Sequence, residues 1–389
     1  MKVASLFSGI GGLEKGLSDS GHETELFCEI MPTARAVLAA WYPDAPRSAD
    51  IRTLAALPAT TDLITAGFPC QDLSQAGLTA GIGGNRSSLV GQVFRLLDAR
   101  PVPWVLLENV SFMLQLNQGH AMTTLVDAFE ARGYRWAYRV VNSLAFVPQR
   151  RERVIFLATR ADSDPADVLM VDDVAPPERL TDLDTHAHGF YWTEGIRGLG
   201  WAQDAIPTLK NGSTVGIPSP PAILMPSGLT ITPDIRDAER LQGFAADWTK
   251  PAERVARASC RWTLVGNAVT VPVAGWIGRR LTRPGGYDRS ADRPLESAKR
   301  WPRAARGERG RRLAVRIGDY PEWRERTPLA AFLEYPGKPL SARATRGFLG
   351  RTERGSLRFV PGFRETLRSH LALMEAVESG FQRPLLAAE

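Results

Sequence analysis

The stretch Ala66-Gly67-Phe68-Pro69-Cys70-Gln71-Asp72-Leu73-Ser74 follows directly on Thr61-Asp62-Leu63-Ile64-Thr65. Residues 61–65 contain the apolar pair Leu63-Ile64 and are short enough for a buried strand. Residues 66–74 therefore begin where that strand would end. A cysteine therefore lies just past a strand end, where open α/β sheets bind their ligands. A thiolate at such a place can act as a nucleophile, although an isolated cysteine is more often a small hydrophobic residue.

The residues before this stretch alternate between strand and helix patterns. We expect a strand over 2–7, a tight turn over Ser8-Gly9-Ile10-Gly11-Gly12, a helix over 13–20, a strand over 24–28 that ends at Glu29, and a helix over 32–41 before Asp50 and Ile51. Nucleotide-binding folds place an acid about 20 residues past such a turn, on ribose hydroxyls. A glycine turn with one acid fits NAD, FAD and S-adenosylmethionine, and the missing full G-x-G-x-x-G pattern counts against the dinucleotides.

A second candidate catalytic group follows the strand expected over 105–110. Glu108 comes after apolar residues, and partial burial would favour its protonated form, which suits a proton donor. A structural carboxylate is the equally simple alternative. A helix is expected over 119–132 and a strand pair over 137–143 and 154–158. Arg151 and Arg153 alternate there, so their side chains should point to one face.

Composition bounds the class of protein. The chain has 389 residues, of which 44% are hydrophobic, enough for two or three domains. Its three cysteines have no metal-like spacing and argue for a reducing compartment. No signal peptide is recognised, and no apolar run approaches the roughly 20 residues that span a membrane. We therefore expect a cytoplasmic protein.

The net charge of +6 is unevenly distributed. Residues 281–389 carry 22 Lys and Arg against 13 Asp and Glu, a net charge of +9, so the rest of the chain carries −3. A basic segment often contacts nucleic acid, although a solvated Arg-rich surface explains it as well.

Taken together, eight motifs resemble those of the bacterial-type DNA (cytosine-5)-methyltransferase family, in its order and roughly at its spacing over residues 1–280. They are Phe7-Ser8-Gly9-Ile10-Gly11-Gly12, Glu29-Ile30, Asp50-Ile51, Gly67-Phe68-Pro69-Cys70-Gln71, Glu108-Asn109-Val110, Gln149 with Arg151 and Arg153, Arg240-Leu241-Gln242-Gly243-Phe244, and Gly266-Asn267-Ala268-Val269. The resemblance implies a Rossmann-like α/β fold: a mixed sheet with helices on both faces, a small target-recognition domain and a C-terminal extension.

The resemblance also implies a chemistry for the catalytic residues. Cys70 resembles the nucleophile that attacks C6 of cytosine, and Glu108 the acid that protonates N3. Arg151 resembles the residue that contacts the base and orients Glu108, with Arg153 as its support. The substrate would be a cytosine flipped out of duplex DNA, and the loop 75–95, with Gly77, Gly81, Gly83 and Gly84 as hinges, would close over it.

The same resemblance assigns the binding residues. S-adenosylmethionine would be held by Phe7, Ser8, Gly9, Ile10, Gly11, Gly12, Glu29, Ile30, Asp50, Ile51, Pro69, Asn267 and Ala268, and DNA by Gln71, Ser74, Gln149, Arg240 and Gln242. No metal is expected, and His186 and His188 are taken as surface residues. The family usually begins its glycine-turn segment with Asp, where this chain has Ser5.

The motifs divide the chain into four parts. Residues 1–160 form the expected catalytic domain, 161–228 the target-recognition region, 229–280 a returning segment that completes the catalytic domain, and 281–389 a basic extension of unknown role. In the extension, 283–312 reads as an extended linker and 363–379 as a helix. Aromatic, amide and basic residues such as Trp192, Trp201, Lys210 and Asn211 suit base and phosphate contacts. For the extension we favour DNA-backbone contact over partner docking or a structural brace.

Alternative functions remain at the level of sequence. An RNA methyltransferase on the same fold is one, but Ser259-Cys260-Arg261-Trp262 does not match the Cys-Phe-Thr signature of that branch. A catalytically silent DNA-binding protein would not need Cys70, Glu108 and Arg151 together, and an NAD oxidoreductase explains none of the later motifs. We expect a monomer in a restriction-modification or phage modification system, with a cognate endonuclease as a functional partner.

Overall fold

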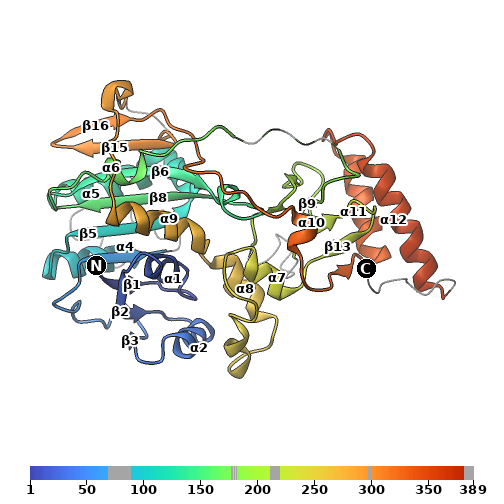
Figure 1. Cartoon of the computed structure of the whole chain (residues 1–389), viewed down its shortest axis with the longest axis horizontal. Coiled ribbons are helices and arrows are strands. Elements are labelled where there is room, and N and C mark those ends of the chain that lie inside the picture. Colours follow the sequence, from blue (N-terminus) through green and yellow to red (C-terminus); the bar gives the residue numbers. More distant parts are fainter. Residues whose placement is uncertain are drawn as a thin grey trace.

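The structure is a computed structural model that describes residues 1–68, 89–176, 178, 180, 182–210, 220–296 and 300–380. These residues form a large body around one sheet and a smaller body around another, side by side along the longest axis (Figure 1). The strands of the large sheet, in spatial order, are β14 (Arg293–Pro294), β16 (Arg311–Ala314), β15 (Ala304–Glu308), β6 (Arg135–Asn142), β8 (Glu152–Thr159), β5 (Trp104–Val110), β4 (Leu63–Ala66), β1 (Lys2–Leu6), β2 (Glu23–Cys28) and β3 (Arg47–Ser48).

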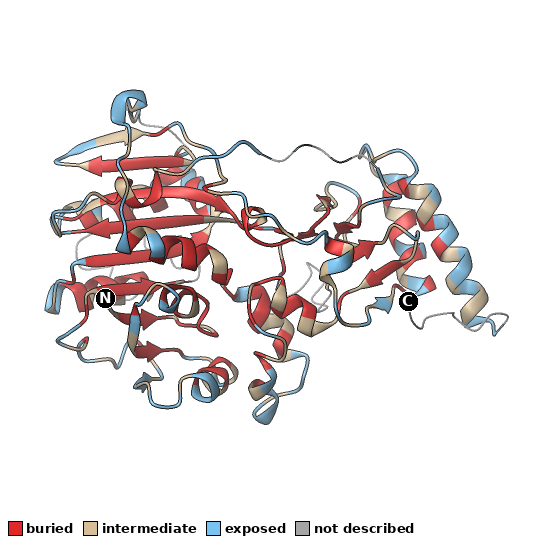
Figure 2. Cartoon of the chain, in the orientation of Figure 1, coloured by how far each residue is buried: buried red, intermediate tan, exposed pale blue. Residues whose placement is uncertain are grey.

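The large sheet is mixed, as expected. Strands β3, β2, β1, β4 and β5 run parallel, whereas β8, β6, β15, β16 and β14 pair antiparallel. Neighbouring residues point to opposite faces: Val3 packs in one core and Ala4 in the other. Helices cover both faces, which explains why the inner strands are buried throughout (Figure 2). The expected α/β fold is confirmed.

Two groups of helices form these cores. On one face, α4 (Leu89–Ala99) and α5 (His120–Glu130) contribute apolar side chains, and on the other α1 (Gly12–Ser18), α6 (Ala166–Leu169) and α9 (Val271–Thr282) do so. Close packing explains two glycines, because a Cβ on Gly12 would lie 2.6 Å from the Val269 carbonyl oxygen, and one on Gly16 would lie 2.4 Å from that of Val271. The remaining helices near this body are α2 (Pro32–Trp41) and α8 (Cys260–Asn267).

The smaller body contains a five-stranded antiparallel sheet. Its order is β10 (Ala202–Gln203), β9 (His188–Phe190), β12 (Ala222–Leu224), β13 (Thr230–Thr232) and β17 (Lys338–Pro339). Helices α11 (Ala342–Arg354) and α12 (Phe363–Glu378) cover it at the end of the molecule farthest from the large sheet (Figure 1). The other elements here are β7 (Gln149–Arg150) paired with β11 (Ile206–Pro207), α7 (Ile235–Arg240) and α10 (Leu329–Phe332).

The structure corrects our description of the C-terminal extension. The segment 283–312 is not simply a linker, because β14, β15 and β16 extend the large sheet from the edge of β6. The last part, from β17 to α12, completes the small sheet and its core. The extension is thus divided between both bodies, with strands in the large sheet and one strand and two helices in the small body. The helix expected over 363–379 is present as α12.

Two expected boundaries also move. Residues 230–232 were assigned to the returning segment, but they form β13 inside the small sheet. Residues 166–169 were assigned to the target-recognition region, but α6 packs in the core of the large body. In both cases the segment packs in the other body, and the local sequence does not show which body that is.

Candidate active site

A cavity of about 640 Å³ lies at the carboxyl ends of the parallel strands. This is where open α/β sheets bind ligands, and most of the described residues expected for cofactor and catalysis line it. Its walls are Phe7, Gly9, Cys28, Glu29, Ile30, Met31, Asp50, Ile51, Gly67, Phe68, Leu89, Glu108, Asn109, Val110, Arg151, Arg153, Gly266 and Asn267. Ser8, Ile10, Gly12 and Ala268 line a smaller adjoining cavity instead, and Gly11 lines neither.

The glycine turn forms one wall and is fixed by Glu29. The backbone N–H of Gly9 donates to Glu29 Oε2 at 2.7 Å, and that of Met31 donates to Oε1 at 2.8 Å. Phe7 and Gly9 have positive φ, 55° and 54°, so the chain reverses tightly before α1. The side chain of Glu29 is thereby held at the cavity edge with lone pairs left on both oxygens.

Asp50 and Ile51 form the far end of the cavity. Asp50 makes a bidentate contact with Arg52, with a shortest distance of 2.6 Å, and its hydrogen bonds to Arg52 lower its pKa. Ile51 is buried, whereas Ile30 is 56% exposed and forms the rim. Apolar walls flanking two fixed carboxylates suit a flat polar ring joined to a sugar.

Glu108 and Arg153 meet at the inner end of the cavity. Arg153 Nε lies 2.9 Å from Glu108 Oε1, and Glu108 is only 7% exposed. The contact is an ion pair without hydrogen-bond geometry, so the buried Oε1 remains without a hydrogen bond among the described residues. Arg153 was expected to support Arg151, but Arg153 itself holds Glu108.

Asn109 connects this acid to the chain that leads to Cys70. Its side-chain amide donates to the Phe68 carbonyl at 3.0 Å, and both residues line the cavity. Pro69, Cys70, Gln71, Ser74 and the predicted hinge glycines lie outside the described residues, as do residues 211–213.

Arg151 makes a different set of contacts from the one expected. Its side chain is buried and donates to the carbonyls of Leu209 at 3.0 Å, Gly266 at 3.1 Å and Ala268 at 2.8 Å. Burial lowers its pKa, and Nε has no hydrogen-bond partner among the described residues. Arg151 therefore joins its own segment to those that contain Leu209 and Gly266–Ala268. Glu108 is held by Arg153 instead.

Gln149, Gln242 and Arg240, which were expected to contact DNA, have partners inside the protein. The Gln149 amide donates to the Leu241 carbonyl at 2.8 Å, and its oxygen accepts from the Leu209 N–H at 3.0 Å. Gln242 is equally buried, and Arg240 pairs with Asp237 at 2.7 Å and with Glu334 at 2.5 Å. Internal partners occupy these groups, so they connect the two bodies instead.

The returning segment closes the cavity. Gly266 and Asn267, at the end of α8, contribute to its wall, and Ala268 lies in a smaller adjoining cavity. The carbonyls of Gly266 and Ala268 are the ones bound by Arg151. The expected placement of Asn267 and Ala268 beside the glycine turn agrees with this geometry.

Sequence reasoning missed two residues at the site. Trp248 donates its indole N–H to the Ile10 carbonyl at 3.0 Å, and Glu14 is buried beside the glycine turn. His188 was taken as a surface residue but is buried and stacks on Trp201, with ring centroids 4.9 Å apart.

The two described cysteines are poor nucleophiles. Burial raises the pKa of Cys28 to about 11 and also raises that of Cys260. A high pKa leaves little thiolate at neutral pH. If this protein uses a cysteine nucleophile, these two positions are unsuited to it.

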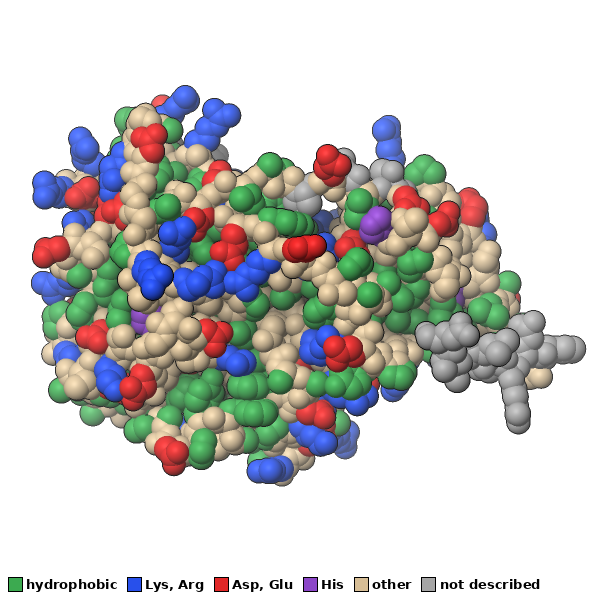
Figure 3. Space-filling model, viewed as in Figure 1, with side chains coloured by type: hydrophobic (Ala, Val, Ile, Leu, Met, Phe, Trp, Pro, Cys, Tyr) green, Lys and Arg blue, Asp and Glu red, His purple; other side chains and the backbone are tan. Residues whose placement is uncertain are grey.

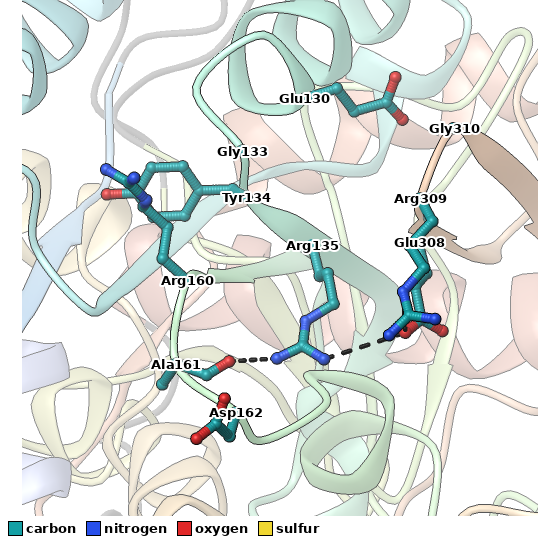
Figure 4. Close-up of a pocket in the computed structure, with 11 residues that line it drawn as sticks. Glu130, Gly133, Tyr134, Arg135, Arg160, Ala161, Asp162, Glu308, Arg309 and Gly310 are labelled. Atoms are coloured by element: carbon teal, nitrogen blue, oxygen red, sulfur yellow. Dashed lines mark hydrogen bonds and ion pairs between the residues drawn. The ribbon is translucent and has the colours of Figure 1, made fainter.

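A second cavity, of about 380 Å³, has no comparable chemistry. It lies at the opposite end of β6 and β8, where Arg135 contacts the Ala161 carbonyl and lies 3.9 Å from Glu308 (Figure 4). Its acids and arginines balance, and none of the glycine-turn residues reaches it. Across the described ranges, no group of three His, Cys, Asp or Glu could hold a metal, and no helix could cross a membrane.

Comparison with known proteins decides the family. A model described as C-5 cytosine-specific DNA methylase matches residues 1–189. Type II methyltransferase M2.BsuMI of Bacillus subtilis (strain 168) is 47% identical over 371 residues, which cover 91% of this chain and 94% of the relative. The chain belongs to the C-5 cytosine-specific DNA methylase family. It is a DNA cytosine-5 methyltransferase, and the alignment to M2.BsuMI is long enough to include most of the C-terminal extension.

More distant relatives share less of this enzyme. Orphan methyltransferase M.SPRI of Bacillus phage SPR is 31% identical over 206 residues, which cover 50% of this chain and 47% of the relative. The crystal structure of S. pombe Dnmt2 methyltransferase superposes with a TM-score of 0.52 at 18% identity, over 72% of this chain and 98% of that one. This last likeness concerns the fold alone.

Proposed function

We propose that the enzyme transfers a methyl group from S-adenosylmethionine to C5 of a cytosine flipped out of duplex DNA, through a covalent bond between Cys70 and C6. The observation that carries the proposal is the buried Glu108, held by Arg153 in the same cavity as the glycine turn and Glu29. An acid for a base and a carboxylate for a ribose thus share one space, as transfer between a nucleotide cofactor and a base requires.

The residues present fit S-adenosylmethionine. Glu29, fixed by two backbone N–H groups, would accept from the ribose hydroxyls, and Asp50 with Ile51 would border the adenine. Phe7 and Ile30 would cover the ring, and Asn267 would close the pocket. When bound, the cofactor supplies an electrophilic methyl group on its sulfonium sulfur.

The protein would supply the remaining chemistry. Cytosine C5 is a poor nucleophile until C6 is bonded to sulfur. As the Cys70 thiolate bonds to C6, Glu108 gives its proton to N3, and the electron pair of the C5–C6 double bond becomes available at C5. After C5 takes the methyl group, a base removes the C5 proton, the double bond re-forms, Cys70 leaves as thiolate and N3 returns its proton to Glu108.

The hydrogen-bond pattern of the cavity supports a base as the missing partner. Glu108 Oε1 is buried and without a hydrogen bond, and buried polar atoms usually have one. The N3 edge of a flipped cytosine offers such a partner. A stacked base could not reach this depth, which is why the proposal includes flipping.

The proposal extends to the biological setting. M2.BsuMI is named a type II methyltransferase and M.SPRI an orphan methyltransferase of a phage. We propose a role in a restriction-modification or phage modification system, on a short site, as a cytoplasmic monomer with a cognate endonuclease as functional partner.

The test uses tritiated S-adenosylmethionine with plasmid DNA and transfer RNA in separate reactions. We expect label in DNA, located at C5 by sequencing the product, and none with Cys70→Ala. Cys260→Ala is the matched control, because this thiol lies on α8 and its pKa is raised, and it should keep activity. Label in RNA alone would overturn the DNA substrate.

A second measurement tests the covalent bond itself. DNA prepared with 5-fluorocytosine carries no C5 proton to be removed, so the adduct should accumulate as a denaturation-resistant protein–DNA complex. Cys70→Ala should form none, and Cys260→Ala should form as much as wild type. Methylation without a trapped complex would overturn the covalent route.

A further inference from the structure

Glu14 is a buried acid that the mechanism above does not use. It lies on α1, two residues past the glycine turn, and is only 2% exposed. Its Oε1 accepts a hydrogen bond from the Thr65 hydroxyl at 2.7 Å, and the hydroxyl of Ser5 also stabilises it. Thr65 and Ser5 are neighbours on paired strands, with Ser5 directly opposite Thr65 in the β1–β4 register.

Position 5 is where this enzyme departs from its family, which usually has Asp there. The Ser5 hydroxyl carries no charge, and its oxygen lies 2.8 Å from Ser8 Oγ. The carboxylate of Glu14 reaches the same place from the opposite side of the turn. The charge missing from the strand is thus supplied by the helix.

Glu14 also lines a cavity. A small cavity of about 40 Å³ is bordered by Glu14, Ser5, the glycine turn and Val269, and it shares Phe7, Gly9, Gly67, Glu108 and Asn267 with the large one. One water needs about 10–15 Å³ on this measure, so the space accommodates a small polar group. It continues the cofactor cavity past the ribose, toward Glu108.

The charge balance around Glu14 is unusual. Within the described residues it has no ion pair with Lys or Arg, and its side chain is hydrogen-bonded to the hydroxyls of Thr65 and Ser5 and to its own backbone. Burial raises the pKa of Glu14 for this reason. An uncompensated buried carboxylate costs free energy, and a bound cation would offset that cost.

We propose that Glu14 binds the α-amino group of the methionine moiety of S-adenosylmethionine, in place of the Asp that the family usually carries at position 5. The ammonium group would enter the small cavity and pair with the carboxylate, which would set the methyl donor at a fixed depth relative to Glu108. This inference rests on the proposed cofactor and deepens it.

The test is cofactor binding measured by calorimetry, without DNA. Glu14→Gln keeps the shape and both hydroxyl contacts but removes the charge. We expect affinity for S-adenosylhomocysteine, which keeps the amino group, to fall by roughly 10- to 100-fold, the value of a charge-assisted hydrogen bond. Affinity for 5′-methylthioadenosine, which lacks the amino-acid portion, should stay within about twofold, because no ammonium is present to lose.

The rescue variant is Ser5→Asp combined with Glu14→Gln. It returns a carboxylate to the usual family position, so it should recover most of the lost affinity for S-adenosylhomocysteine. If Glu14→Gln alone fails to fold, judged by circular dichroism, the double variant still decides. It should prefer S-adenosylhomocysteine over 5′-methylthioadenosine as strongly as wild type does.

The failures are distinguishable. An equal loss of affinity for both ligands in Glu14→Gln, or a double variant without the preference, would overturn the role of Glu14 and leave the cofactor in place. Wild-type enzyme that binds neither S-adenosylmethionine nor S-adenosylhomocysteine would overturn the proposed cofactor and this inference together.

Discussion

Arg153 holds Glu108 across two antiparallel strands, with Nε 2.9 Å from Oε1. The register explains the contact: Val110 on β5 lies opposite Arg153 on β8, and Glu108 is two residues back on the same face. Glu108 on β5 thus meets Arg153 on the adjacent strand β8 directly, and the contact depends on no loop. Two rigid strands fix the acid in the cavity.

The first prediction concerns Arg153→Ala. Without the guanidinium, Glu108 loses the group that positions it, so methyl transfer in a single turnover should slow by about 100-fold or more, the range of general-acid effects. Affinity for S-adenosylmethionine should change little, because Arg153 lies at the base end of the cavity. Single-turnover rates and calorimetry measure the two quantities separately.

Arg160→Ala is the matched control for that experiment. Arg160 follows the other end of β8 and stacks over Tyr134 at 5.8 Å, away from Glu108. It should retain wild-type rates. An Arg153→Ala enzyme that binds cofactor weakly but transfers methyl groups at the normal rate would place Arg153 at the cofactor instead.

The second prediction is that Gln149→Leu destabilises the fold. The change leaves the Leu241 carbonyl and the Leu209 N–H without partners in a buried place. Each unsatisfied group costs about 1–3 kcal/mol, so the free energy of unfolding should fall by roughly 2–6 kcal/mol. Urea denaturation measures it.

DNA binding distinguishes this role from the one expected from sequence. If Gln149 contacted a phosphate or a base, Gln149→Leu would lower DNA affinity and leave stability unchanged. Arg150→Ala serves as the neighbouring control, because its exposed side chain can be removed without breaking a hydrogen bond of Gln149. It should leave the urea midpoint within experimental error of wild type.

Local signals predicted the catalytic half of the fold well. Pro32 begins and Trp41 ends the expected helix over 32–41, because proline suits the first turn and the chain turns before Pro43. The apolar run before Glu108 predicted β5, and alternation placed Arg151 and Arg153 at one cavity. These features depend on residues that are close in sequence.

Features that depend on distant partners could not be predicted. The residues of β15, Ala304–Glu308, have no strand pattern and form a strand because β6, far upstream in the chain, offers a free edge on which Ala304 pairs with Arg139. Asp292, at 2.7 Å, is the nearest of three carboxylates that compensate the charge of the buried Arg306. Basic and acidic side chains are interspersed over the visible surface (Figure 3), and some arginines of the extension, such as Arg303 and Arg312, form ion pairs.

The third prediction concerns pH. His370 on α12 accepts from the Thr230 N–H through Nδ1 at 3.3 Å and donates to the Leu340 carbonyl through Nε2 at 2.9 Å. Burial lowers its pKa below the ordinary 6.5, so the folded state binds fewer protons than the unfolded one. Stability should therefore be full above about pH 6.5 and fall as the solution is acidified, by at most ~1.4 kcal/mol per pH unit for this group.

Urea midpoints between pH 8 and pH 5 check this prediction. His370→Gln removes the titrating group and should flatten part of the acid side of the curve. His186→Gln is the control, since the side chain of His186 is partly exposed. A curve that keeps its full acid dependence in His370→Gln would assign the effect to His22 or His188, whose pKa values burial also lowers.

The fourth prediction tests whether the C-terminal helices belong to the small body. The ring of Phe363 on α12 is fully buried and packs edge-to-face on Phe190 of β9, with centroids 5.3 Å apart, and on Trp201 at 5.0 Å. Phe363→Ala should lower the free energy of unfolding of this body by about 3–5 kcal/mol, the usual cost of such a cavity. Because the cofactor cavity lies in the other body, binding of S-adenosylmethionine should persist while specific DNA binding weakens. Leu373→Ala, at a 42% exposed position on the same helix, should change neither. Equal loss of cofactor and DNA binding in Phe363→Ala would show instead that the two bodies fold as one unit.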